Sequence, residues 1–287
     1  MRFSERQGFI SARTEIQTFG IDESFRVAIW NVVFQVYFEN VRMDWTYSTR
    51  EPFGRLLAGL WTQFHKGPLD ELPEAWEMRN KVKEWILKAE WFHVYDLVES
   101  FAQLGGDVSP PRIFAAVFNA TAQRNMGGYR LVDSRIVQAT SAEVVEAIDR
   151  GLADARQAAT ANVQNHLSKA LALLADRKSP DYPNSIKESI SAVEALARLV
   201  TGREKATLGD AVRRFRDSGL DIHPALEGAL LKLYGYSSDA DGIRHAARDI
   251  PSSSHEDALF FLGTCSSFVS YMIAKCAKAE ISLVQTA

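Results

Sequence analysis

Hydrophobic residues in the first half of the chain recur at the three- and four-residue spacing of amphipathic helices. Phe25, Ile29 and Val32 follow Asp22, whose carboxylate suits the N-terminal cap of a helix, and they predict a helix over residues 22–40. Comparable spacing predicts further helices over residues 53–64, over 73–104 as one broken helix or two, and from 109 onward, where prolines fit a first turn.

A small β-hairpin is predicted between the two halves of the chain. Two runs rich in β-branched residues, 129–132 and 136–139, flank a polar turn at 133–135. All six tryptophans of the 287-residue chain lie in the first third, whereas the second half is rich in alanine, leucine, valine and serine. This shift indicates two different hydrophobic cores, so we place a domain boundary at the hairpin, with domains at 1–140 and 141–287.

The second half carries helical patterns only. An apolar stripe from Ile148 to Leu174 predicts one long helix that begins at Ser141. Further helices are predicted from the cap residue Asn184 to Val200, over 208–215, over 224–234, and over a last segment from Ala258 to Cys276. The chain is thus predicted to be mainly α, and its second domain an antiparallel helical bundle.

Composition and charge restrict the class of protein. The chain is 46% hydrophobic and 24% charged with a net charge of -3, which argues against a protein that coats nucleic acid through a broad basic surface. Any RNA contact is therefore expected to be local. We find no long apolar run free of charges, and the opening residues lack the apolar core of a signal peptide. We expect a cytoplasmic protein with no membrane contact.

The two cysteines, Cys265 and Cys276, lie eleven residues apart on one predicted helix. At the helical rise this separates them by roughly 16 Å, far beyond the reach of a disulfide. They are predicted to be buried thiols.

The candidate chemistry lies in one turn-rich segment before the last predicted helix. It contains Arg244, His245, Arg248, Asp249 and, further on, His255. A guanidinium stabilises charge on a phosphate and an imidazole transfers protons near neutral pH, so the segment suits phosphoryl-transfer chemistry on RNA. Taken alone, an arginine-histidine doublet is more often a helix cap or a partner of the helix dipole, and this structural interpretation stays open.

The other titratable residues are interpreted as structural. His93 and His166 are expected to be packing or surface residues, His65 precedes a loop, and His223 lies before a proline near a helix start. Glu188 and Glu194 share one predicted helix, where two carboxylates are more often solvated or salt-bridged than paired acids. No histidine pair has zinc-ligand spacing with supporting cysteines, and no phosphate-binding glycine loop is present. Neither a metal nor another cofactor is expected.

Several stretches of the chain carry a family resemblance. In the second half they are the runs 184–195, 222–226, 232–236 and 242–246, which read NSIKESISAVEA, IHPAL, KLYGY and GIRHA. These runs resemble the carboxyl-terminal HEPN domain of AbiJ-like abortive-infection proteins. The opening RFSER at 2–6 and WNVV at 30–33 are similar to the amino-terminal domain of that family, so the two resemblances span nearly the whole chain.

The resemblance implies an antiphage defence protein whose HEPN domain cleaves RNA, with tRNA among the candidates, without a metal. In catalytic HEPN domains an arginine, a polar residue and a histidine stand at or before the last helix, with four to six residues between the arginine and the histidine. After Arg244 no histidine falls in that window, because His245 is adjacent to it. After Arg248 the spacing is met: Asp249 is the polar residue, and six residues lie between Arg248 and His255. Because the doublet itself resembles the AbiJ-like subfamily, Arg244 and His245 rank first as catalytic residues and the other three second.

Two functions stand as alternatives. In the first, a neutral imidazole takes the proton of an RNA 2′-hydroxyl, an arginine stabilises the phosphate charge, and the product carries a 2′,3′-cyclic phosphate. Adjacent side chains such as Arg244 and His245 point in different directions, so a homodimer through the HEPN domain is expected to present two copies across a cleft. The amino-terminal domain then senses a phage-derived trigger or restrains the activity. In the second, a noncatalytic HEPN module binds RNA, a nucleotide or a partner protein, and the doublet is a clamp near Asp239 and Asp241.

Overall fold

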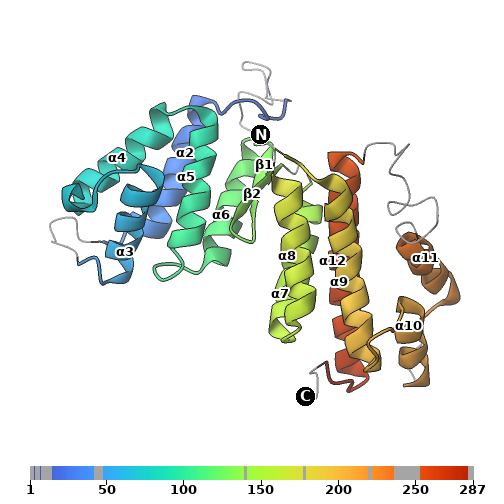
Figure 1. Ribbon diagram of the computed structural model, residues 1–287. Helices are drawn as coiled ribbons and strands as arrows, with labels where there is room; N and C mark the ends of the chain where they lie inside the picture. The colour runs from blue at the N-terminus through green and yellow to red at the C-terminus, as the bar shows by residue number, and fades with distance from the viewer. Residues whose placement is uncertain are drawn as a thin grey trace. The chain divides into compact units, whose positions relative to one another are not determined.

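The computed structural model describes residues 3, 7, 15–41, 48–138, 141–176, 179–218, 222–235 and 253–283. The chain divides into two compact units, Met1–Ala142 and Glu143–Ala287. The first unit holds helices and a two-stranded hairpin, and the second holds helices only among its described residues (Figure 1). The predicted mainly helical architecture is confirmed.

The helices of the first unit begin and end close to the boundaries predicted from hydrophobic spacing. They are α2 (Glu23–Val33), continued by the π-helix η1 (Phe34–Phe38), α3 (Pro52–Gly59), continued by the π-helix η2 (Leu60–Phe64), the 3-10 helix η3 (Leu69–Glu71), α4 (Ala75–Lys88), α5 (Trp91–Leu104) and α6 (Pro111–Arg124). Asp22 is the N-cap of α2 and accepts a hydrogen bond from the Phe25 amide. The run 73–104 is two helices, because the backbone becomes extended at Ala89.

Aromatic rings fill the core of the first unit. Tyr37 packs on Phe101, with ring centroids 4.9 Å apart, and edge-on to Phe114 at 5.1 Å. The Tyr37 hydroxyl donates a hydrogen bond to the Phe101 carbonyl oxygen, which satisfies a polar group inside the core, and burial raises the pKa of Tyr37. Helix α2 contacts both α4 and α6, so the aromatic-rich part of the sequence builds one continuous core.

The predicted hairpin is present as β1 (Tyr129–Val132) and β2 (Arg135–Gln138) in antiparallel register. Asp133 and Ser134 form its turn with φ of 45° and 61°, the left-handed geometry of a two-residue hairpin loop. The Asn119 side chain of α6 donates to the Leu131 carbonyl oxygen at 2.8 Å and accepts from the Leu131 amide at 2.7 Å. This one amide therefore ties the outer edge of β1 to the helical core.

The helices of the second unit are α7 (Ala142–Gln157), α8 (Ala161–Ala175), α9 (Tyr182–Thr201), α10 (Leu208–Asp217), α11 (Pro224–Gly235) and α12 (His255–Lys278). The single helix predicted from Ser141 through Leu174 is wrong. Its two parts, α7 and α8, are separated by a tight turn in which Ala159 has a φ of 54° and the Thr160 hydroxyl donates to the Ala155 carbonyl oxygen. Both helices bury their share of the apolar stripe, so spacing alone did not show the break.

Side-chain caps set the starts of α9 and α12. Asp181 caps α9 by accepting a hydrogen bond from the Asn184 amide, so the predicted cap at Asn184 is wrong. Helix α9 begins before Asn184 because Pro183 fits the first turn of a helix. At α12, Ser254 and Asp257 form a reciprocal capping box, in which each side chain accepts from the other's backbone amide.

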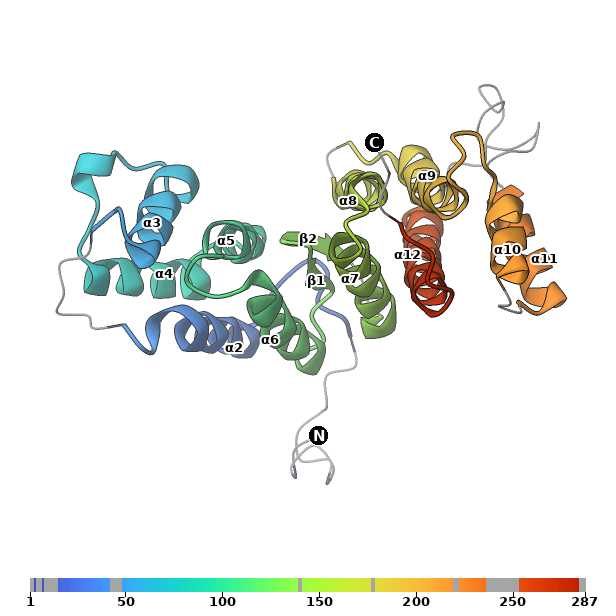
Figure 2. The same ribbon diagram turned by 90° about the horizontal axis from the view of Figure 1, so that it is seen from below.

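Helices α7, α8, α9 and α12 lie together in the second unit, with α10 and α11 on the α9 side (Figure 2). Helices α8 and α9 are antiparallel. The Ser185 hydroxyl of α9 donates to the Ala170 carbonyl oxygen of α8. Glu188 comes later than Ser185 on α9, but its partner His166 comes earlier than Ala170 on α8. The predicted antiparallel packing is therefore present in this pair.

Small residues allow α7 and α12 to approach closely. A Cβ atom built on Gly151 of α7 would lie 2.8 Å from the backbone of Ser266 on α12. A Cβ atom on Gly263 of α12 would lie 3.0 Å from the Val144 side chain of α7. At Gly151, the contact between the two helices leaves no room for a side chain.

Helix α12 carries a long apolar stretch. Residues 258–274 have no charge, which corrects the expectation that the chain lacks such a run. Its length and mean hydropathy of 1.4 suffice to cross a membrane, but half of the stretch is buried inside the unit, and core helices share these properties. Cys265 and Cys276 are free and buried on this helix, as predicted, and burial raises their thiol pKa to about 12 and about 11.

Candidate functional site

His255 is the member of the predicted catalytic set that the structure describes. The other members of the set lie outside the described residues: Arg244, His245, Arg248 and Asp249. The same holds for the two residues of the alternative clamp, Asp239 and Asp241. His255 is the first residue of α12, and its ring centroid lies 5.9 Å from that of Tyr182, which begins α9. The described part of the predicted site is thus at the end of the second unit where α9 and α12 begin (Figure 1).

The backbone at His255 is held by the capping box of Ser254 and Asp257. An N-terminal helix end carries unpaired amide groups and a positive partial charge, which favour an anion such as phosphate, while Glu256 and Asp257 in the same turn partly offset that charge. The His255 side chain is half-buried, so its imidazole is accessible from solvent. The imidazole of His255 therefore stands at the N-terminal end of α12, beside two acidic side chains.

A second polar cluster joins α8 to α9. Glu188 is 9% exposed, and its two carboxylate oxygens have separate partners: Oε2 lies 2.7 Å from His166 Nδ1, and Oε1 accepts from Lys169 Nζ at 2.6 Å. Burial raises the pKa of Glu188, but the hydrogen bonds from Lys169 and His166 outweigh that effect, and the pKa is lowered overall. Glu188 is therefore a charged carboxylate at neutral pH that orients an imidazole. The prediction that it is salt-bridged is confirmed.

Sequence reasoning gave His166 no functional role, although its side chain is 36% exposed and faces a cavity. One signal was present, because His166 and Lys169 are three residues apart and share a helix face. Their partner Glu188 comes from another helix and is brought to them only by the packing of α8 against α9.

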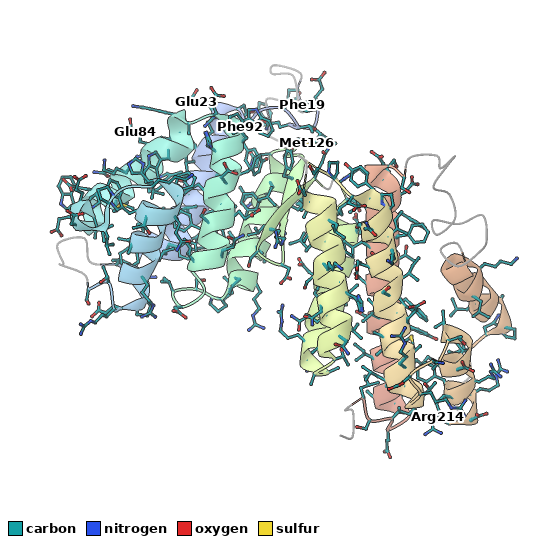
Figure 3. All side chains as sticks on the ribbon, viewed as in Figure 1. Phe19, Glu23, Glu84, Phe92, Met126 and Arg214 are labelled. Atoms are coloured by element: carbon teal, nitrogen blue, oxygen red, sulfur yellow. The ribbon has the colours of Figure 1, made fainter. Side chains whose placement is uncertain are left out.

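A cavity of about 930 Å³, lined by both polar and apolar residues, lies at the other end of the second unit from His255. Its walls come from the first turns of α8, the last turns of α9, the end of α10 and the segment that follows α12. The basic residues that line it are His166, Arg198, Arg203 and Arg214. Figure 3 shows Arg214 on α10, at the end of the unit where α9 and α12 also end.

The arginines of this cavity differ in their partners. Arg198 forms an ion pair with Glu194, one turn earlier on α9, at 3.3 Å. Neither Arg203 nor Arg214 has an ion pair with another residue in the part of the chain that the structure describes. The carboxylates on the lining are Glu204 and Glu280. The guanidinium groups of Arg203 and Arg214 thus have N–H donors that are available to a ligand in the cavity.

The first unit has a hollow of about 560 Å³ between η2, α4 and α5. His65 stacks against Trp61 and Trp85, with ring centroids 4.4 and 5.1 Å apart, and His93 lies on the surface with Nδ1 3.1 Å from Asp96 Oδ2. The surface position of His93 agrees with the sequence interpretation, whereas the packing of His65 on two tryptophans was not predicted. Among the described residues, no group of three histidine, cysteine or acidic side chains is placed to hold a metal.

A family model described as AbiJ N-terminal domain 4 matches residues 1–154, which is more than half of the chain. The match covers the first unit and most of α7. No curated protein and no solved structure matches the chain. His255, the His166 cluster and the arginine-lined cavity all lie beyond the matched residues.

Proposed function

The chain belongs to the AbiJ N-terminal domain 4 family, and on that basis we propose an abortive-infection protein whose second unit is a metal-independent endoribonuclease of the HEPN type. The antiphage defence role follows from the family. The ribonuclease activity is a further step, and it rests on the second unit.

The observation that carries the proposal is the position of His255. It begins the last described helix of the second unit, six positions after Asp249 in the segment that also contains Arg244, His245 and Arg248. The resemblance to HEPN domains assigns RNA cleavage to an arginine and a histidine at this point of the fold. The capping box at Ser254 supports the proposal, because it presents the imidazole from an ordered helix end.

The proposed reaction needs only the RNA and the protein. A neutral imidazole accepts the proton of a 2′-hydroxyl, the 2′-oxygen attacks the adjacent phosphorus, and the bond from phosphorus to the 5′-oxygen breaks. The leaving 5′-oxygen takes up a proton, so the products carry a 2′,3′-cyclic phosphate and a 5′-hydroxyl. An arginine donates hydrogen bonds to the phosphate oxygens as negative charge develops. Arg244 and His245 are the first candidates, and Arg248, Asp249 and His255 the second.

A homodimer through the second unit is part of the proposal. Two neighbouring side chains of one chain do not converge easily on one phosphate, whereas two chains supply an arginine and a histidine from opposite sides. Phe260, 57% exposed in the second turn of α12, supports a contact close to His255. The first unit is proposed to receive the phage-derived signal, and the substrate to be cytoplasmic RNA such as tRNA.

Cleavage of RNA by the purified full-length protein in excess chelator tests the proposal. We expect fragments with 2′,3′-cyclic phosphate ends from the wild type, and their loss in Arg244→Ala or His245→Ala. Loss of cleavage only in Arg248→Ala or His255→Ala assigns catalysis to the second set of residues. Cleavage that persists in all four variants, or that stops on chelation, contradicts the proposal. Circular dichroism of each variant separates lost chemistry from lost folding.

The second candidate function is a noncatalytic HEPN module that binds RNA, a nucleotide or a partner protein. The arginine-lined cavity favours it, because a binding module needs a polar recess and this one lies away from His255. A folded protein that binds RNA or a nucleotide, without cleaving RNA under any condition, would identify this second function.

A further inference from the structure

Three arginines from different parts of the sequence converge on the cavity at the end of α9. Arg198 comes from the last turn of α9, Arg203 follows the Gly202 C-cap of that helix, and Arg214 comes from the last turn of α10. His166 reaches the same cavity from α8. Because His166 engages Glu188 through Nδ1, Nε2 is the ring nitrogen left for a ligand.

We propose that this cavity is a binding site for the phosphate groups of a nucleotide, either free or at the end of an RNA strand. Guanidinium groups bind phosphate oxygens through paired, charge-assisted hydrogen bonds, and several of them in one recess suit a ligand with more than one charge. The volume of about 930 Å³ is in the range of small-molecule sites.

Helix ends explain part of the charge but not all of it. The carboxyl ends of α9, α10 and α12 contribute to the cavity, and basic side chains stabilise such ends. Arg198 serves this role and is also paired with Glu194. Arg203 and Arg214 have no ion pair with another described residue, although Arg203 adds, after the Thr207 hydrogen bonds, to the lowering of the Asp210 pKa. Their guanidinium groups therefore have hydrogen-bond donors available to a ligand.

The polar groups beside the arginines favour a nucleotide over a simple anion. Glu204 and Glu280 are carboxylates on the lining, and Thr201 and Ser218 add hydroxyl groups. A carboxylate repels phosphate but accepts hydrogen bonds from ribose hydroxyls, which is how acidic residues hold sugars in dinucleotide sites. The cavity thus combines donors for phosphate with acceptors for a sugar.

The site is separate from the proposed cleavage segment. His255 begins α12, whereas the cavity includes Ala279 and Glu280, just beyond its other end. A helix of 24 residues is about 36 Å long, so a ligand in the cavity does not reach His255. The inference therefore goes beyond the proposed ribonuclease activity and does not require it.

Binding by the full-length protein tests the inference without relying on cleavage. The probes are ATP, adenosine, inorganic phosphate, and a 2′-O-methyl oligonucleotide with either a 5′-phosphate or a 5′-hydroxyl, which has no hydroxyl for cleavage. Affinities are measured by calorimetry for the wild type, Arg203→Gln and Arg214→Gln. Arg213→Gln is the matched control, because Arg213 neighbours Arg214 on α10 but pairs with Asp210 and does not line the cavity.

We expect ATP or the 5′-phosphorylated oligonucleotide to bind more tightly than adenosine and the 5′-hydroxyl form. Arg203→Gln and Arg214→Gln are expected to weaken binding at least about tenfold, and Arg213→Gln by less than about twofold. Preference for ATP identifies a free nucleotide, and preference for the oligonucleotide identifies an RNA end. The inference is overturned if binding weakens equally in all three variants, if it is unchanged in the two cavity variants, or if none of the probes binds. None of these results depends on RNA cleavage, so failure of either proposal is recognised separately.

Discussion

His166 Nδ1 lies 2.7 Å from Glu188 Oε2, and this contact joins α8 to α9 at a nearly buried position. Lys169 Nζ donates to the other carboxylate oxygen at 2.6 Å. A buried carboxylate is costly unless its oxygens are hydrogen-bonded, and here Lys169 and His166, which share one helix face, meet that need. The cluster therefore fixes the register of α8 against α9 and orients the imidazole at the cavity.

Replacement of Glu188 by glutamine is expected to destabilise the second unit. Glutamine keeps the volume but removes the charge that both His166 and Lys169 engage, so we expect a loss of about 1–3 kcal/mol in unfolding free energy. Thermal unfolding followed by circular dichroism measures it. The control is Glu146→Gln on α7, which breaks an exposed ion pair with Arg150 and should change stability by less than about 1 kcal/mol. Equal effects of the two substitutions would argue against a structural role for the cluster.

The same carboxylate predicts an acid-sensitive stability. The pKa of Glu188 in the folded protein is lowered below the ordinary value of 4.5, so its stabilising contribution is complete above that pH and is lost as the pH falls through the folded pKa. The stability difference between wild type and Glu188→Gln should therefore shrink as the pH is lowered below 4.5. Melting temperatures of both proteins from pH 7 downward provide the test. A difference that stays constant or grows in acid contradicts this assignment.

Gly151 is expected to be intolerant of any side chain. A Cβ atom there would lie 2.8 Å from the Ser266 backbone, which cannot move without shifting α12. Overpacking of this kind costs about 1–3 kcal/mol, so Gly151→Ala should lower the melting temperature although alanine favours helix. Gly209→Ala in α10 is the control, because its nearest neighbour atoms would be 3.7 Å away. A Gly151→Ala protein as stable as the control would show that α7 and α12 do not approach so closely.

Asn119 is expected to hold the hairpin in place. Its side chain satisfies both the amide and the carbonyl group of Leu131, which point away from the partner strand. Asn119→Ala leaves both groups without this partner and should cost about 1–3 kcal/mol. Hydrogen exchange at the Leu131 amide should accelerate in the variant. Asn80→Ala, at an exposed amide on α4, is the control, and unchanged Leu131 exchange in Asn119→Ala would refute the role.

The sequence predicted helices well where apolar spacing coincided with a capping or breaking residue. Asp22 before α2 and the turn at 133–135 marked real boundaries, because each has a specific backbone geometry. The break between α7 and α8 was missed because Ala159 adopts a left-handed conformation that no glycine or asparagine announced. The uncharged stretch of α12 was also missed, since its serines and threonine interrupt the apolar residues without adding charge.

The candidate site was predictable only where its residues are neighbours in sequence. The segment from Arg244 to His255 stood out as a local cluster of basic and titratable side chains. The His166 cluster and the arginine-lined cavity are assembled from helices far apart in the chain. Their residues looked like ordinary surface charges until α8, α9 and α10 were packed together.

The nature of RNA ends in infected cells tests the central claim most directly. The experiment compares phage-challenged cells that express the wild-type protein with cells that express a combined variant. The combined variant carries Arg244→Ala, His245→Ala, Arg248→Ala and His255→Ala. RNA from both is sequenced by a method that captures 2′,3′-cyclic phosphate ends. We expect new ends of this type in the wild type only, together with protection of the culture against phage. Protection by the wild type without new cyclic phosphate ends, or the same ends from the combined variant, would contradict the claim that this segment cleaves RNA.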